Sequence, residues 1–284
     1  MERKSGVLMH VSSLWGEYSC GSFGASAKEF IDFLSRAGFS YWQVLPFGLV
    51  DECNSPYKSY STFGGNPYFV DLEKLFQDGL ITKEELNSSR QQTPYSCEFD
   101  RLREERVKLL INASKRADDA LKEKIKAFIN GNKYLKEFCC FMALKKKNNQ
   151  KEWTLWENAL FDKDVEFGWQ FIQYEFFTQW AEIKKYANEK GIGIIGDIPI
   201  YVSFDSSDVY WSRKLFMLDD NNKMTDVAGV PPDYFAEDGQ LWGNPLYDWN
   251  EMEKDNYSWW KDRISLALSL FDGVRIDHFR AFES

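Results

Sequence analysis

Two aspartates follow short apolar runs at widely separated points of the chain. Asp197 comes directly after residues 192–196, and Asp277 comes directly after residues 274–276. A carboxylate at the end of a buried strand is costly unless it is paired or used. Arg275 lies two residues before Asp277, so in a strand both side chains share one side and the arginine can keep Asp277 ionised. The pattern predicts carboxylate chemistry at strand ends; the alternative is an aspartate that only caps the following turn.

Aromatic residues gather in three segments rich in Gly, Pro and Asn, at 55–60, 231–235 and 240–245. Such composition is typical of ordered loops. Aromatic rings beside amide and hydroxyl groups are suited to carbohydrate, because sugars offer apolar C–H faces for stacking and hydroxyls for hydrogen bonds. The alternative is that the rings anchor long loops to the core. The candidate substrate-binding residues here are Ser55, Tyr57, Phe235, Gln240, Trp242 and Asn244.

Composition excludes several other chemistries. The 284 residues carry a net charge of −9, which argues against nucleic acid as a partner. The histidines are His10 and His278, too few for a multi-histidine metal site or for most acyl-transfer triads. The phosphate-binding motif G-x-x-x-x-G-K-[ST] does not occur, and no cofactor or metal is indicated. Carboxylates plus aromatics favour glycosyl chemistry, in which retaining enzymes use two carboxyl groups about 5–5.5 Å apart.

The elements that must position these residues follow an α/β pattern at both ends of the chain. Apolar residues at helical spacing predict a helix over 27–37, before a strand at 41–45, and another helix over 260–271, before the strand at 274–276. Between them the chain is rich in Lys and Glu and strongly helical, with stripes over 121–129 and 172–187. We therefore divide the chain into 1–80, 81–190 as a helical insertion or subdomain, and 191–284. In a parallel barrel the strand ends would bring Asp197 and Asp277 to one face.

Compartment and surface charge are only weakly specified. No apolar run approaches the roughly 20 residues that span a bilayer, so we expect no membrane partner. Five cysteines, an odd number without a Cys-x-x-Cys motif, favour a reduced cytoplasmic protein. The triplet Lys145–Lys146–Lys147 is interpreted as a solvated helix end rather than as a site for an anionic partner. Nothing in the sequence indicates an oligomeric state.

Seven motifs together resemble glycoside hydrolase family seventy-seven, the 4-α-glucanotransferases known as amylomaltases or disproportionating enzymes. The resemblance covers roughly residues 5–72 and 191–284, whereas the helical middle is similar mainly in character. The motifs are GVLMH at 6–10, WQVLP at 42–46, SPY at 55–57, GDIPIYV at 196–202, VAGVPPDYF at 227–235, WGNPLY at 242–247 and VRIDHFR at 274–280.

The resemblance implies a (β/α)8 barrel of the α-amylase type and a role for each matching residue. Asp277 would be the nucleophile and Arg275 its charge partner. Asp197 would bind sugar hydroxyls in the donor subsite, and Tyr57 would stack beside the reacting sugar. The other implied substrate-binding residues are His278, which would orient the substrate, and Phe235, Gln240 and Trp242, which would lie on a loop over a glucan channel.

The implied reaction is a double displacement on α-1,4-glucans, in which a glucan 4-hydroxyl instead of water accepts the chain. The family's acid/base Glu and a His-Asp pair lie beyond the nucleophile motif, and this sequence ends at Ser284. We therefore expect about the first half of the barrel and an inactive, N-terminal portion of a transferase. The alternative is a glucan-binding or interaction module without turnover.

Overall fold

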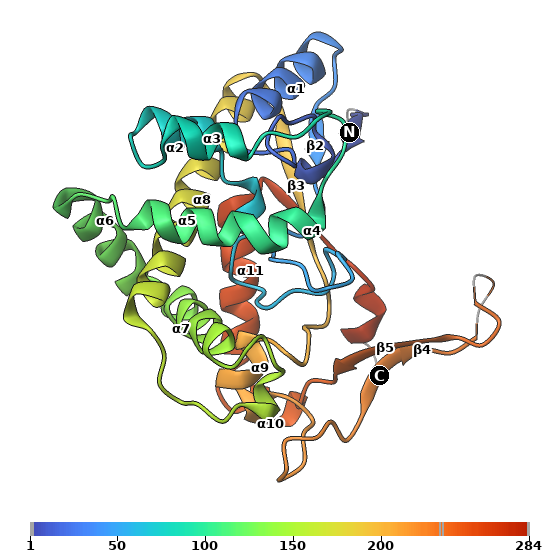
Figure 1. Ribbon diagram of the computed structural model, residues 1–284. Coiled ribbons are helices and arrows are strands. Elements are labelled where there is room, and N and C mark those ends of the chain that lie inside the picture. The colour runs from blue at the N-terminus through green and yellow to red at the C-terminus, as the bar shows by residue number, and fades with distance from the viewer. Residues whose placement is uncertain (1–2, 233, 235, 283–284) are drawn as a thin grey trace.

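A four-stranded parallel sheet lies at the centre of the structure (Figure 1). The computed structural model describes residues 3–232, 234 and 236–282. Helices cover the sheet, so the predicted α/β fold with a parallel sheet is confirmed. In spatial order the strands are β1 (Gly6–Leu8), β2 (Tyr41–Gln43), β3 (Gly193–Ile198) and β6 (Gly273–Ile276).

Helices connect the strands, and most of them lie between β2 and β3. A π-helical stretch at Leu102–Arg106 joins α4 to α5. The helices are α1 (Ala25–Arg36), α2 (Leu72–Gln77), α3 (Lys83–Ser88), α4 (Phe99–Arg101), α5 (Val107–Ser114), α6 (Asp119–Asn130), α7 (Lys133–Lys147), α8 (Lys163–Glu189), α9 (Ser207–Trp211), α10 (Trp249–Glu253) and α11 (Ser258–Leu270).

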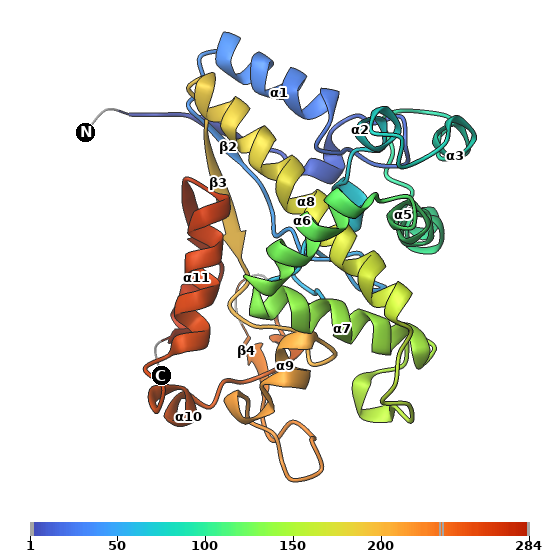
Figure 2. The same ribbon diagram turned by 90° about the vertical axis from the view of Figure 1, so that its left-hand side faces the viewer.

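Local sequence explains where several helices begin and end. Thr82 and Glu85 form a capping box at the start of α3, and Asp118 accepts a hydrogen bond from the Leu121 amide at the start of α6. After α8 the chain passes through Gly191, whose φ of +77° favours glycine. The long helix α8 and the helix α11 both contact β3 and flank it (Figure 2).

The core behind the sheet is aromatic and centres on Trp180 of α8. Its ring lies 4.7 Å from Phe47 and 5.1 Å from Phe23, measured between centroids, and its indole N–H donates to the Leu270 carbonyl at 3.0 Å. Gly196 on β3 faces this packing, since a Cβ there would lie 2.1 Å from the Phe271 ring. Close packing of these rings fixes β3 against α8 and α11.

Three details of the sequence interpretation are wrong. Residues 227–230 and 240–245 form an antiparallel hairpin, β4 (Val227–Val230) and β5 (Gln240–Pro245), which projects from the body in Figure 1. The Gly and Pro content of this segment predicted a loop, but Gln240, Trp242 and Asn244 lie on a strand. Cross-strand pairing satisfies the backbone groups there. Leu268 is one of the apolar residues at helical spacing that predicted the helix over 260–271, but it is 52% exposed, because α11 packs only one face inward.

Lys145 is the third correction, because its side chain is 1% exposed instead of solvated. Its ammonium group forms an ion pair with Asp205 and donates to the carbonyls of Gln150 and Lys151, each at 3.2 Å. It also lies 4.8 Å from the centre of the Tyr60 ring. A buried lysine remains charged only with such partners, so Lys145 is a structural cation rather than an anion-binding group.

Within the described part of the chain, no helix combines the length and apolarity needed to cross a bilayer. The same residues contain no group of three or more His, Cys, Asp or Glu side chains placed to hold a metal ion.

His10 is a core residue at the end of β1. It is 8% exposed, its Nδ1 accepts a hydrogen bond from the Leu45 amide at 3.3 Å, and its ring lies edge-on to Phe69 at 5.2 Å. Burial lowers the pKa of His10 to about 4. The imidazole therefore stays neutral near neutral pH and links the end of β1 to the segment after β2.

We predict that His10 contributes to acid destabilisation. The imidazole has a pKa near 6.5 in the unfolded chain and about 4 in the folded one, so its contribution is complete above about pH 6.5 and is lost as pH falls toward 4. The full difference corresponds to roughly 3 kcal/mol. His10→Asn keeps a hydrogen-bond acceptor but does not titrate. Urea unfolding at pH 7 and pH 4.5 should show a smaller pH loss in the variant; equal pH losses in both proteins would contradict the prediction.

Candidate functional site

Strand register brings three charged side chains together at the carboxyl ends of β3 and β6. Asp197 of β3 pairs directly with Arg275 of β6, and Ile198 pairs with Ile276. Side chains at paired positions of neighbouring strands share a face, and residues two apart on one strand do so too. Asp197, Arg275 and Asp277 therefore project to the same side of the sheet.

The Arg275 guanidinium lies between the two carboxylates. Its Nη1 donates to Asp197 Oδ2 at 2.7 Å, and its Nη2 donates to Asp277 Oδ1. The expected contact between Arg275 and Asp277 is thus present, and the contact with Asp197 is an addition that local spacing did not predict. Charge-assisted hydrogen bonds of this kind fix both carboxylates in direction as well as charge.

Tyr57 completes the cluster from the segment after β2. Its hydroxyl donates to Asp197 Oδ2 at 2.7 Å and accepts from Arg275 Nη1 at 3.5 Å. Ser55 shapes the turn, because its Oγ accepts a hydrogen bond from the Tyr57 amide at 3.3 Å. Burial, together with the hydrogen bond to Asp197, raises the pKa of Tyr57 to about 12. The phenol is therefore a neutral donor at physiological pH.

The Asp197 carboxylate is fully enclosed, with a side-chain exposure of 0% against 36% for Asp277. Burial raises its pKa, while the hydrogen bond from Tyr57 and the charge of Arg275 oppose that rise. Its second oxygen, Oδ1, has no hydrogen-bond partner among the described residues. Tyr57 and Asp197 also line a second, more enclosed cavity together with Pro46 and Phe47.

A groove of about 500 Å³ runs beside this cluster. The Trp242 and His278 rings meet edge to face at 4.9 Å, and Tyr201 lies 6.1 Å from Trp242 between ring centroids. Asp197 does not line this groove. The side chains that line it include Ser55, Tyr57, Tyr201, Gln240, Trp242, Asn244, Asp277 and His278.

The groove residues differ in how far their polar groups are already engaged. The Gln240 side-chain oxygen accepts from the Trp242 indole N–H at 3.1 Å, so these two residues support each other along β5. The buried Asn244 donates its amide to the Val202 carbonyl at 2.8 Å. Its amide N–H therefore holds the backbone after β3. Phe235 lies outside the described residues.

His278 adopts a left-handed backbone conformation, with φ of +52°. This conformation is uncommon for residues other than glycine and turns the chain sharply just after Asp277. The turn places the His278 ring against Trp242 on the hairpin. The nucleophile candidate and the hairpin are thereby joined through one residue.

Sequence analysis missed Arg263 and Tyr247, which hold the segment after β3. The buried Arg263 donates to the Ile200 carbonyl at 3.1 Å and also to the Pro199 carbonyl, and its guanidinium lies 4.7 Å from the Trp260 ring. The Tyr247 hydroxyl donates to the Ile200 carbonyl at 2.7 Å. A signal was available, since Arg263 follows Trp260 by three residues and so shares its inward helix face.

Comparisons with known proteins show the family to which the chain is related. The family model described as 4-alpha-glucanotransferase matches residues 9–284. The chain belongs to the 4-alpha-glucanotransferase family. It is 44% identical over 300 residues to the 4-alpha-glucanotransferase of Clostridium butyricum, covering 97% of this chain and 60% of that protein. With the enzyme of Thermus thermophilus it shares 39% identity, covering 100% of this chain and 60% of that protein.

Solved structures place the fold in the same family. The chain is similar to an amylomaltase from Streptococcus agalactiae in complex with acarbose, with a TM-score of 0.93 and 36% identity over 99% of this chain and 60% of that one. An amylomaltase from Corynebacterium glutamicum gives a TM-score of 0.78 at 17% identity, covering 98% of this chain and 41% of that one, and supports the fold alone. The chain thus spans about 60% of the length of the curated 4-alpha-glucanotransferases of Clostridium butyricum and Thermus thermophilus.

We predict that Arg275 stabilises this family member by neutralising Asp197. Arg275→Met leaves the enclosed carboxylate without its cation and should cost about 1–3 kcal/mol at pH 7, discounted because Arg275 is itself 45% exposed on its side chain. Burial already raises the folded-state pKa of Asp197, and loss of the cation raises it further. The stability lost in the variant therefore returns as pH falls and the carboxyl takes a proton.

A double-mutant cycle with Asp197→Asn isolates this interaction. Urea unfolding at pH 7 and pH 5 should show a smaller deficit for Arg275→Met at pH 5. Because an asparagine side chain carries no charge, the arginine substitution should cost less in the Asp197→Asn background. Equal deficits at both pH values, together with simple additivity, would refute the assignment.

Proposed function

We propose that this sequence contributes the nucleophile and donor side of a 4-α-glucanotransferase active site that acts by retaining double displacement. The observation that carries the proposal is the Arg275 guanidinium held between enclosed Asp197 and groove-facing Asp277. One carboxylate balances the arginine charge, so the other retains its negative charge and nucleophilicity. Membership of the 4-alpha-glucanotransferase family gives this arrangement its reaction class.

In the first step Asp277 attacks the anomeric carbon of an α-1,4-glucan. The glycosidic C–O bond breaks, a general acid protonates the leaving oxygen, and a covalent glycosyl-enzyme forms. In the second step the 4-hydroxyl of another glucan attacks the same carbon, loses its proton to the general base and releases Asp277. Aromatic walls formed by Tyr57, Tyr201 and Trp242 would keep water from this intermediate.

Asp197 is not suited to be the general acid. Its Oδ2 already accepts hydrogen bonds from Tyr57 and Arg275, its Oδ1 is enclosed, and it does not line the groove in which the glycosidic oxygen would lie. We therefore infer that the acid/base carboxyl belongs to the part of the family's length that these 284 residues do not span. The proposal assigns binding and nucleophilic attack to the described residues, and proton transfer to that remaining part.

The lining of the groove supports the proposed substrate class. Aromatic rings and hydrogen-bonding groups both line it, a combination that suits maltooligosaccharides. The amylomaltase from Streptococcus agalactiae was solved in complex with acarbose. Because this chain is 36% identical to that amylomaltase, we propose that it also binds α-glucans.

We predict that Asp277→Asn abolishes transfer in the full-length protein. Loss of a nucleophile typically reduces turnover by more than about 10⁴-fold. Maltotriose is incubated with the enzyme, and glucose and longer maltodextrins are quantified. Asp100→Asn is the matched control, because the Asp100 side chain is 97% exposed on α4, and it should retain activity. Retention of activity by Asp277→Asn would remove Asp277 from the mechanism.

The 284-residue chain alone should bind maltodextrin but give negligible transfer, because general acid help is typically worth about 10²–10⁴-fold. Isothermal titration with a long maltodextrin measures binding. Trp242→Ala should weaken it about five- to tenfold through loss of stacking, whereas Trp15→Ala, on a separate surface, should not. Robust disproportionation by this chain would contradict the division of roles; binding without transfer in the full-length protein as well would favour the glucan-binding module.

A further inference from the structure

Two segments far apart in the sequence are tied together away from the groove. The Glu98 amide donates to the Ser19 carbonyl at 2.8 Å, and the Ser19 hydroxyl donates to the Glu98 carboxylate at 2.9 Å. The Gln91 amide also donates to the Glu17 carbonyl at 2.9 Å. The loop before α1 is therefore joined to the segment before α4 by backbone and side chain together.

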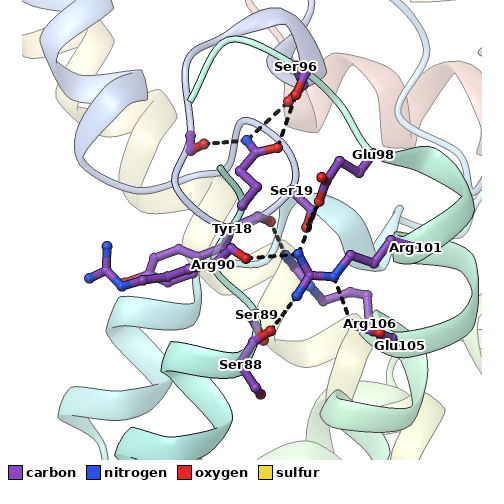
Figure 3. A network of polar contacts seen from close by, with 12 residues as sticks. Tyr18, Ser19, Ser88, Ser89, Arg90, Ser96, Glu98, Arg101, Glu105 and Arg106 are labelled. Carbon is purple, nitrogen blue, oxygen red and sulfur yellow. Dashed lines mark hydrogen bonds and ion pairs between the residues drawn. The ribbon is translucent and has the colours of Figure 1, made fainter. Parts of the chain in front are cut away.

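Arg101 extends this junction into a polar network (Figure 3). Its guanidinium contacts the carboxylates of Glu98 and Glu105 at 3.1 and 2.9 Å and donates to the Arg90 carbonyl at 2.8 Å. Arg106 donates to the carbonyl of Tyr18. The network orders the backbone on both sides of the junction.

Cys20 and Cys97 flank the junction, since Cys20 follows Ser19 and Cys97 precedes Glu98. The two thiols lie close enough for each to shift the pKa of the other, and the Cys20 thiol also donates to the Ser12 carbonyl at 4.0 Å. Neither forms a disulfide; Cys20 is 3% exposed, and Cys97 is half-buried. Cys97 is thus the more accessible thiol of the pair, and Cys20 is buried.

Charge makes the two thiols unequal. The hydrogen bond from Cys20 lowers the pKa of Cys97, and the charge of buried Arg106 acts in the same direction against burial and Glu98. The hydrogen bond with Cys97, together with burial, raises the pKa of Cys20. A more exposed, more acidic thiol beside a buried resolving thiol is the arrangement found in oxidation-sensitive pairs.

We propose that Cys97 and Cys20 form a peroxide-sensitive dithiol that closes to an intramolecular disulfide. The Cys97 thiolate attacks one oxygen of hydrogen peroxide, the O–O bond breaks, and sulfenic acid and hydroxide form. Cys20 sulfur then attacks the Cys97 sulfur, the S–O bond breaks, and a second water leaves with the Cys20 proton. In sum, two thiols lose two electrons and two protons, and one peroxide becomes two waters.

The disulfide would covalently reinforce the junction already made by Ser19 and Glu98. It would close a loop that contains α1, β2, α2 and α3, so it restricts the unfolded chain over a long span. Cys139 and Cys140 are poorer targets for this reaction: burial raises the pKa of Cys140 to about 11, and Cys139, buried in α7, also has its pKa raised by burial. Exposed Cys53 serves as an internal comparison.

The test uses the reduced full-length protein exposed to hydrogen peroxide near stoichiometric amounts. Peptide mapping without reduction should find a Cys20–Cys97 cross-link with a mass loss of about 2 Da for two hydrogens. The Tm should rise by on the order of 5 °C, and dithiothreitol should reverse that rise. Cys97→Val should abolish both changes. Cys53→Ser should leave both unchanged.

Circular dichroism and the reduced-state Tm establish that each variant folds. Cys20→Val, which keeps Cys97, should instead accumulate sulfenic acid, detectable with dimedone. Oxidation confined to Cys53, or sulfinic acid at Cys97 with Cys20 still reduced, would overturn the proposal. A cross-link that forms without any rise in Tm would overturn the inferred stabilisation.

Discussion

The site depends on one register, the pairing of Asp197 on β3 with Arg275 on β6. A parallel pair places these residues side by side, and the period of two then places Asp277 on the same face as Arg275. A slip of one residue would turn Asp197 away from the arginine and leave a carboxylate buried without a cation. The ion pair and the strand register therefore require each other, and both the electrostatics and the geometry of the site follow from them.

The register is in turn held from behind the sheet. Trp180 packs against the rings around β3, and Gly196 leaves the room that the Phe271 ring occupies. Beyond the strand, Arg263 and Tyr247 bind the carbonyls of the next segment, which carries Tyr201 to the groove. The helices thus fix the groove through backbone contacts, and substitutions at α11 can alter a surface that they do not touch.

Sequence reasoning succeeded where periodicity and strand ends decide the outcome. Helix α8, the strands carrying Asp197 and Asp277, and the contact between Arg275 and Asp277 all follow from local spacing. It failed where the partner is distant in sequence. The fold decides which segments meet, and it brings Lys145 to Asp205 and Arg263 to its carbonyl partners. Without that knowledge, a basic residue on a helix is predicted to be solvated. The hairpin was missed because segments rich in Gly and Pro occur both in loops and in strands that contain a β-bulge.

Asp197 is enclosed and lies outside the groove, whereas Asp277 lines it, and this difference sets the charge balance of the cluster. Two carboxylates and one guanidinium leave one net negative charge, and the enclosed carboxylate cannot share it with water. The net negative charge therefore lies at the Asp277 carboxylate, which lines the groove and is the nucleophile in the proposed mechanism. In the proposed mechanism Arg275 would also lower the cost of releasing Asp277 from the glycosyl-enzyme, since a carboxylate next to a cation is a better leaving group. Tyr57, with its pKa raised to about 12, stays neutral and gives its hydrogen bond to Asp197 without changing that balance. In the proposed mechanism, donor binding and the charge of the nucleophile would therefore depend on different groups of one cluster.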